Sequence, residues 1–388
     1  MIIDDAKNMQ KHLVELREDF HRHPEISCQE KTTAARVVKE LQDIGGYEIS
    51  ENVYGYGILA EIKGPKEGKT IALRADMDAL QIVEETGLPF VSENHGVMHA
   101  CGHDCHMTVL LGAARLLQER QAEICGTVRL IFQPAEENNP TGGAQGMIAA
   151  GALEGVDAIF GMHVWPDLPV GAIGMKAGPI MAASDHFSIT MHGKSCHAAQ
   201  PDAGIDTVVA GAQFVTAIQT VVSRNVSPLK AAVITIGSFY AGSRYNILAE
   251  ECVIEGTCRT YELSVRKLVE ERLRKILDGI CTGMGTTYDL KYDHGYMATI
   301  NDPAMAAYFT KTVETTLGKN AAVTVEAPSM CSEDFAYYLM EKPGAFGWLG
   351  VGNRECANYP LHSSKLCVDE EALWQGAATL AAVALNFK

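Results

Sequence analysis

Two hydrophobic patterns alternate along the first half of the chain. Short runs that are almost wholly apolar predict strands buried on both faces, and longer runs with apolar residues three or four positions apart predict helices. The predicted strands are residues 57–63, 70–76, 126–132 and 158–163, and the predicted helices are residues 5–22, 30–41, 109–117 and 144–150. Strands that alternate with helices are typical of a mostly parallel sheet. We therefore predict an α/β domain here.

The pattern changes near Ile180. Strands are predicted at residues 185–192, 231–240, 250–261 and 287–292, and helices at residues 205–222 and 264–284. The order βαββαβ is that of a ferredoxin-like domain with four antiparallel strands and two helices on one face. The first pattern then returns, with a strand at residues 345–350 and helix caps at Asp302, Ser332–Asp334 and Asp369. We expect residues 1–180 and 295–388 to form one domain, and residues 181–294 to form an inserted satellite domain.

Residues that often bind metals follow three of the buried strands. These residues are Asp76 and Asp78, Glu136 and Glu137, and His163. In open α/β sheets, ligand sites gather at the carboxyl ends of the strands. Between them lies the segment Met98–Asp104, in which Cys101 and His103 offer a thiol and an imidazole that suit a borderline-soft divalent metal. Each residue alone is more often an ordinary loop residue, but together they predict a metal site.

Composition narrows the classes of function. The 388 residues carry a net charge of −16, which argues against nucleic acid or an anionic membrane as a partner. No apolar run approaches the roughly 20 residues that span a bilayer, and the N-terminus lacks the basic-then-apolar build of a signal peptide. The 11 cysteines are scattered without a C-x-x-C pair, which is typical of reduced thiols. We expect a cytoplasmic protein.

Several longer motifs occur in order along the chain. They are Arg74–Ala79, Met98–Asp104, Phe132–Glu137, Gly161–His163 and Ser332–Phe335. Together they resemble the signatures of the aminoacylase, hippurate hydrolase and auxin-conjugate hydrolase family of dinuclear metal amidohydrolases and peptidases. The resemblance covers essentially the whole chain, from His21 to Glu370. It implies a zinc-peptidase-like catalytic domain with a mostly parallel sheet and an inserted ferredoxin-like satellite, in agreement with the hydrophobic pattern.

The resemblance also implies two divalent metal ions, with the Cys101 thiolate between them. The implied ligands are Cys101, His103, Glu137, His163 and His362. This donor set does not select one metal: manganese is expected from the resemblance, and zinc, cobalt and nickel are alternatives. Glu136 resembles the general base of the family. Asp78 resembles a group that orients a ligand, and Asp76 has no assigned role.

Three residues of the satellite domain resemble residues that act on the substrate. His197 resembles a histidine that stabilises the oxyanion, often from the neighbouring subunit, although an ordinary loop histidine is the alternative. Asn246 and Arg259 lie where relatives place substrate contacts, and an arginine fork suits a substrate carboxylate. The resemblance therefore implies a homodimer formed through the satellite domain.

The expected reaction is hydrolysis of the amide bond of an N-acyl-L-amino acid, which releases a carboxylate and a free amino acid. A dipeptidase or carboxypeptidase on the same scaffold is one alternative, but the cysteine in the ligand set favours the amidohydrolase. A non-catalytic binding protein with a vestigial metal site is another alternative. Such a protein is expected to have lost a ligand or the base, and all of these residues are present.

Overall fold

The computed structural model describes residues 1–352 and 359–388. These residues divide into two compact units. The larger unit comprises Met1–Ile180, Thr299–Pro328 and Asp334–Lys388, and the satellite unit comprises Met181–Ala298 and Ser329–Glu333. Among the helices of the described residues, none has both the length and the apolar character needed to cross a membrane.

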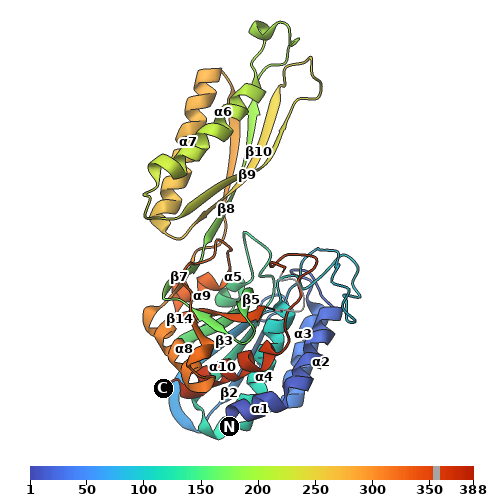
Figure 1. The fold of residues 1–388 in the computed structure, drawn as a ribbon, viewed down its shortest axis with the longest axis vertical. Coiled ribbons are helices and arrows are strands. Elements are labelled where there is room, and N and C mark those ends of the chain that lie inside the picture. Colours follow the sequence, from blue (N-terminus) through green and yellow to red (C-terminus); the bar gives the residue numbers. More distant parts are fainter. Residues whose placement is uncertain (353–358) are drawn as a thin grey trace. The chain divides into compact units, whose positions relative to one another are not determined.

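An eight-stranded sheet forms the centre of the larger unit (Figure 1). In spatial order its strands are β1 (Glu48–Ser50), β2 (Ile58–Lys63), β4 (Cys125–Gln133), β3 (Lys66–Asp76), β5 (Ala158–Pro169), β14 (Gly344–Gly352), β6 (Ile173–Met175) and β13 (Ala322–Thr324). The four central strands β4, β3, β5 and β14 run parallel, and antiparallel pairs lie toward both edges. The predicted mostly parallel α/β sheet is therefore confirmed.

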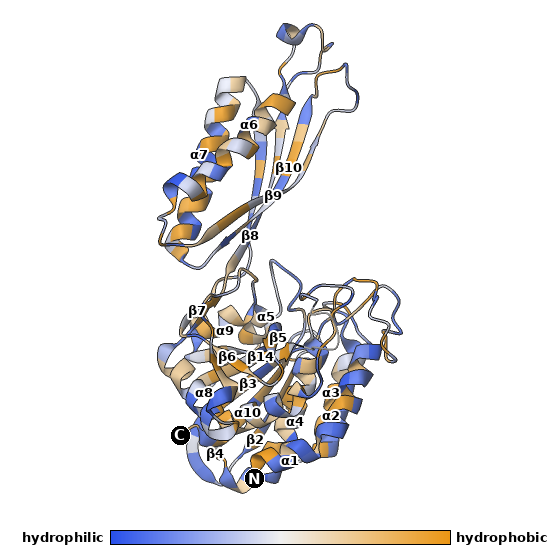
Figure 2. Ribbon diagram, viewed as in Figure 1, coloured by the Kyte–Doolittle hydropathy of each residue, from blue (hydrophilic) through white to orange (hydrophobic). Residues whose placement is uncertain are grey.

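Helices pack against this sheet. They are α1 (Ile2–Asn8), α2 (Gln10–Arg22), α3 (Lys31–Ile44), α4 (His103–Glu119), α5 (Ala144–Ala149), α8 (Pro303–Thr316), α9 (Phe335–Glu341) and α10 (Ala372–Asn386). Both α2 and α3 have a hydrophobic and a hydrophilic face (Figure 2). A Cβ atom at Gly112 of α4 would lie 2.9 Å from Ala377 of α10 and 2.9 Å from Leu13 of α2. The missing side chain thus allows the three helices to pack closely.

Several element boundaries differ from the prediction. The helix predicted at residues 5–22 is two helices that meet at Met9. Helix α4 begins at His103, six residues before the predicted start at residue 109. The prediction was late because the first turn of the helix is polar and lies outside the apolar period. Asp369 does not cap the last helix: α10 begins at Ala372, and Asp369 accepts a hydrogen bond from the backbone of Glu371 at 3.0 Å. Five strands of three or four residues were too short to predict: β1, β6, β13, β7 (Gly178–Met181) and β12 (Thr299–Asn301).

The satellite unit has the predicted βαββαβ order. Its elements are β8 (Ala183–His192), α6 (Thr207–Thr220), β9 (Ala232–Ala241), β10 (Glu251–Thr260), α7 (Leu263–Met284) and β11 (Thr287–His294). The strands form an antiparallel sheet in the order β11-β8-β10-β9, and residues such as Phe187 and Phe214 fill its core. Residues 329–333 also belong to this unit, since Cys331 O accepts a hydrogen bond from Ala182 N at 2.8 Å. The hydrophobic pattern had grouped these five residues with the larger domain.

Candidate metal centre

Gly102 brings the Cys101 loop against strand β5. Its φ is 82°, a left-handed value that glycine adopts without strain, and it precedes the first residue of α4. A Cβ atom at this position would clash with the side chain of Val164. A glycine is therefore required both for the turn and for the close approach that sets Cys101 and His103 beside His163.

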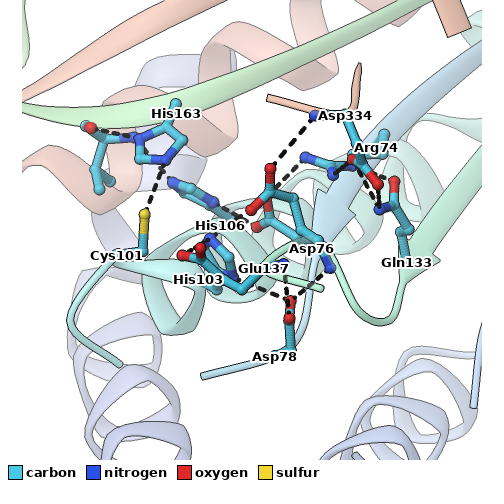
Figure 3. Close-up of polar contacts among 12 residues, drawn as sticks. Arg74, Asp76, Asp78, Cys101, His103, His106, Gln133, Glu137, His163 and Asp334 are labelled. Carbon is cyan, nitrogen blue, oxygen red and sulfur yellow. Dashed lines mark hydrogen bonds and ion pairs between the residues drawn. The ribbon is translucent and has the colours of Figure 1, made fainter. Parts of the chain in front are cut away.

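Cys101, His103 and His163 form the first group of potential metal ligands. All three are buried, and their donor atoms lie within 4.8 Å of one another. Cys101 Sγ lies 3.3 Å from His163 Nε2 (Figure 3). His163 Nδ1 donates to the backbone oxygen of Val164 at 2.7 Å, so Nε2 carries no proton and can bind a metal. Burial lowers the pKa of His163 well below its usual value, which keeps the ring neutral.

Cys101 also belongs to a second group, with Glu137 and His362, whose donor atoms again lie within 4.8 Å of one another. His362 Nε2 lies 3.3 Å from Glu137 Oε1. The His362 backbone donates to Ala100 O at 2.8 Å, which ties the C-terminal loop to the Cys101 loop. Cys101 is thus shared by two neighbouring groups of three donors.

The charges around these groups favour a cation. Burial alone would lower the pKa of His103, but Asp76, Asp78 and Glu137 raise it to about 10. Burial and the carboxylates of Glu137 and Glu136 raise the pKa of the Cys101 thiol well above its usual value. Within the described residues, the buried atoms His103 Nε2 and Glu137 Oε1 make no hydrogen bond. Glu137 Oε1 instead faces His103 Nε2 at 4.0 Å and His362 Nε2 at 3.3 Å. Donors that face one another in this way fit a divalent metal ion.

Asp78 holds several parts of the centre at once. Its Oδ1 accepts a hydrogen bond from Glu136 N at 3.0 Å, and its Oδ2 accepts one from Glu137 N at 3.0 Å. Oδ1 also lies 3.4 Å from His103 Nδ1. Glu136 is 5% exposed, and its Oε1 accepts a hydrogen bond from the backbone of Asp334 at 3.3 Å. The structure therefore brings together the five predicted ligands, the predicted base and the predicted orienting carboxylate.

Residues 72–386 match the model of peptidase family M20/M25/M40. The chain belongs to this family. The N-acetyl-L-cysteine deacetylase of Bacillus subtilis is 41% identical over 370 residues, which cover 95% of this chain and 86% of the relative. Thermostable carboxypeptidase 1 of Saccharolobus solfataricus is 38% identical over 387 residues, 99% of this chain and 97% of the relative. The solved structure of the Bacillus subtilis YXEP protein, described as a dinuclear metal binding peptidase from the M20 family, has a TM-score of 0.84 at 38% identity and covers 98% of each chain. The resemblance seen in the sequence motifs is confirmed.

One histidine of this M20 site was missed from the sequence. His106 Nδ1 donates to Asp76 Oδ1 at 2.6 Å, and His106 Nε2 accepts a hydrogen bond from Val164 N at 2.9 Å. Asp76, which had no assigned role, therefore fixes the orientation of His106 against the strand that carries His163. The sequence did contain a signal for His106: it lies three residues after His103, so the two histidines share one face of a helix.

A buried network supports the other side of the centre. Arg74 donates to Asp76 at 2.7 Å, to Asp334 at 2.8 Å and to Gln133 at 2.9 Å (Figure 3). Asp334 Oδ2 also accepts hydrogen bonds from the backbone of Gly143 and Ala144, both at 2.9 Å. Asp334 was predicted as a helix cap, but its carboxylate makes no capping bond to α9. It instead links α5 to the strand ends.

The three predicted substrate-contacting residues of the satellite unit, His197, Asn246 and Arg259, do not lie together within one chain. His197 forms a β-bridge with Ile247, and Ala198 N donates to Asn246 O at 3.1 Å, so His197 and Asn246 lie in adjacent loops. These loops lie near the start of β10, because Gly193 N donates to Glu250 O at 2.8 Å. Arg259 lies near the other end of β10, about 25 Å away at roughly 3.3 Å per residue, where it donates to Ser332 Oγ at 3.0 Å.

Proposed function

We propose that this protein is a dinuclear metal-dependent amidohydrolase that cleaves N-acyl-L-amino acids into a carboxylate and a free amino acid. One observation carries the proposal: Cys101 is shared by two groups of three donors, of which only His362 is exposed, and the carboxylate of Glu136 lies beside them. The deacetylase name of a relative that is 41% identical supports the choice of substrate class.

The residues of the centre have different roles in the proposed reaction. Cys101, His103 and His163 would hold one divalent ion, and Cys101, Glu137 and His362 would hold the second. When bound, such ions polarise the amide carbonyl and lower the pKa of a water molecule. Glu136 accepts the proton of the attacking water and returns it to the leaving nitrogen. Asp78 and the backbone of Asp334 keep Glu136 in place for both transfers.

We further infer a homodimer in which His197 and Asn246 serve the site of the partner subunit. This inference is supported by the separation of these residues from Arg259 along β10, since one substrate cannot contact both ends of the strand. His197 would stabilise the negative charge that develops on the carbonyl oxygen, and Arg259 would bind the substrate carboxylate.

Manganese is our first choice of metal because of the family resemblance. Zinc, cobalt and nickel are alternatives, because the donor set of thiolate, imidazole and carboxylate accepts all four metals. A cytoplasmic location is supported by the cysteines of the described residues, which are all free; Cys356 lies outside those residues. A cytoplasmic cysteine stays reduced and can serve as a metal ligand.

A dipeptidase or carboxypeptidase activity is the second candidate, because a relative that is 38% identical carries the name of a carboxypeptidase. The deciding experiment measures the release of free amino acids from N-acetyl-, N-benzoyl- and indole-acetyl-amino acids and from dipeptides. Metal-stripped protein is assayed after the addition of manganese, zinc, cobalt or nickel. Cleavage of dipeptides alone would move the protein to the peptidase branch.

The variant Glu136→Gln tests the mechanism in the same assay. We expect kcat to fall by about 10²- to 10⁴-fold, the usual contribution of a general acid–base group. Metal content, measured by plasma mass spectrometry, should stay unchanged, because Glu136 is not among the proposed ligands. The exposed Glu154→Gln serves as the control. Binding of metals without turnover of any panel substrate would favour the non-catalytic binding protein over the amidohydrolase.

A further inference from the structure

Three consecutive backbone N–H groups beside the metal centre are held by two buried carboxylates. Ala135 N donates to Glu30 Oε1 at 2.8 Å, and the next two N–H groups, of Glu136 and Glu137, each donate to Asp78 at 3.0 Å. Asp78 was predicted to act here. Glu30 was not, and it precedes Ala135 by 105 residues in the sequence.

The same oxygen of Glu30 accepts a second hydrogen bond, from Cys28 N at 2.9 Å. Cys28 and Ala135 have φ values of 66° and 58°, in the left-handed region that residues with a Cβ atom rarely adopt. Such conformations persist only where the surroundings impose them. One carboxylate oxygen thus restrains two strained residues in segments that are far apart in sequence.

Glu30 does not have the ordinary role that its position suggests. It is the residue before the first turn of α3, yet its side chain accepts no capping hydrogen bond from that helix. It is instead 0% exposed. Burying a carboxylate is costly without hydrogen-bond partners, and the partners that it has lie in the loops before α3 and before Glu136.

The conformation of Ala135 determines where the next two side chains point. Glu136 and Glu137 follow it directly, and a change in φ at Ala135 would rotate both away from His103. We propose that Glu30 is a positioning residue that acts through Ala135 to hold Glu136 in reach of the substrate and Glu137 in reach of the metal. This inference rests on the proposed function for Glu136, but its effect on metal binding through Glu137 can be measured separately.

The charge of Glu30 supports this role. Burial, together with the nearby charge of Asp78, raises the pKa of Glu30 to about 7, against the hydrogen bonds from the backbone. The Cys28 thiol also lies close by, and its pKa is raised by burial and then by the charges of Glu30 and Asp78. A charged acceptor makes a stronger hydrogen bond than a neutral one, so the restraint on Ala135 strengthens as pH rises through neutrality.

The test compares Glu30→Ala and Glu30→Gln with a matched control in the helix that follows Glu30. Glu40 of α3 is also buried, at 4% exposed, but it pairs with His12 and Arg115 away from the centre. We expect Glu30→Ala to lower kcat about 10- to 100-fold with little change in KM, since a displacement of about 1 Å can cost that much. Glu40→Ala should leave kcat unchanged even if it lowers the melting temperature.

The glutamine variant separates positioning from general stability. Its amide oxygen can accept both hydrogen bonds but carries no charge, so we expect kcat within about tenfold of the wild type and the loss of one ionisation near neutral pH from its pH profile. Manganese titration provides the readout that is independent of turnover. Because Glu137 follows Ala135, Glu30→Ala should weaken manganese affinity about 10- to 100-fold, and Glu30→Gln should weaken it less.

The inference is overturned if Glu30→Ala matches the control variant in kcat, pH profile and manganese affinity. If Glu30→Ala does not fold, the same comparison is made with Glu30→Gln. A wild-type protein that binds manganese but cleaves no panel substrate would refute the proposed function alone. In that case a loss of manganese affinity in Glu30→Ala, but not in Glu40→Ala, would still support the positioning of Glu137.

Discussion

Replacing Arg17 with methionine would show how much a buried charge beside the metal centre stabilises the larger unit. The Arg17 side chain is 3% exposed and donates to Asp104 at 2.8 Å and to Glu370 at 3.1 Å. Asp104 is fully buried and follows the proposed ligand His103. Burial alone would raise the pKa of Asp104, but Arg17 and His21 hold it well below its usual value, so the carboxylate is ionised at neutral pH.

The expected loss follows from this burial. Removing one partner of a buried ion pair typically costs about 3–5 kcal/mol, because the remaining charge is left unpaired in a medium of low dielectric constant. Methionine fills much of the space of the arginine chain, so we expect about 3 kcal/mol. The control is Arg36→Met. Arg36 also bonds an aspartate at 2.7 Å, but its side chain is 33% exposed, and such pairs contribute about 0–1 kcal/mol.

Unfolding in urea, followed by tryptophan fluorescence, measures both losses. The three tryptophans, Trp165, Trp348 and Trp374, all belong to the larger unit, so the signal reports on that unit. In Arg17→Met the carboxylate of Asp104 keeps one partner, His21 Nδ1 at 2.7 Å. Adding Asp104→Asn to Arg17→Met removes the charge that has lost its arginine and should recover part of the stability. Equal losses for Arg17→Met and Arg36→Met, or no recovery in the double variant, would refute the reasoning.

Two further predictions concern Gly143, which follows the loop that carries the base, and the charge of Glu30. A Cβ atom at Gly143 would clash with the backbone oxygen of Pro134, so Gly143→Ala should lower kcat and cost more than about 2 kcal/mol of stability. The control is Gly279→Ala in α7. A Cβ atom there would meet nothing within 4 Å, so the substitution should stabilise the helix by about 0.5–1 kcal/mol. Thermal and urea unfolding check both, and an equal effect would contradict the clash. The pKa of Glu30 rises from 4.5 to about 7 on folding, so the folded state binds more protons in this window and stability should fall as pH rises through it, by up to about 3 kcal/mol. Urea unfolding at a series of pH values should show this decline in the wild type and not in Glu30→Gln, and identical curves would rule it out.

The sequence allowed the metal centre to be predicted because its donors follow strand ends or lie in long motifs. Asp78 and Glu137 follow apolar strands, and His163 ends the apolar run at residues 158–163, so periodicity placed all three at one edge of the sheet. Strand β5 itself continues beyond His163 to Pro169, where the sequence becomes less apolar. His362 had no such signal and came from the resemblance. It lies in a loop, and the hydrogen bond from its backbone to Ala100 shows why it reaches the centre.

The supporting residues could not be predicted, because their partners are distant in sequence. Arg17 meets Asp104 across 87 positions, and Glu30 meets Ala135 across 105. Arginine on a helix and glutamate before one are common at surfaces, so nothing local marks these two as buried. The ends of helices were also uncertain, as at His103, where a polar first turn lies outside the hydrophobic period.

The place of β14 in the sheet has a consequence for synthesis on the ribosome. This strand lies between β5 and β6, yet it is made after every strand of the satellite sheet, which is complete at His294. A nascent chain can therefore fold the satellite sheet while β5, the apolar strand that carries His163, still lacks its neighbour. An unpaired apolar strand edge is a template for aggregation. The interval between His294 and Gly344 is thus the stretch of translation during which a chaperone that covers β5 would help the chain most.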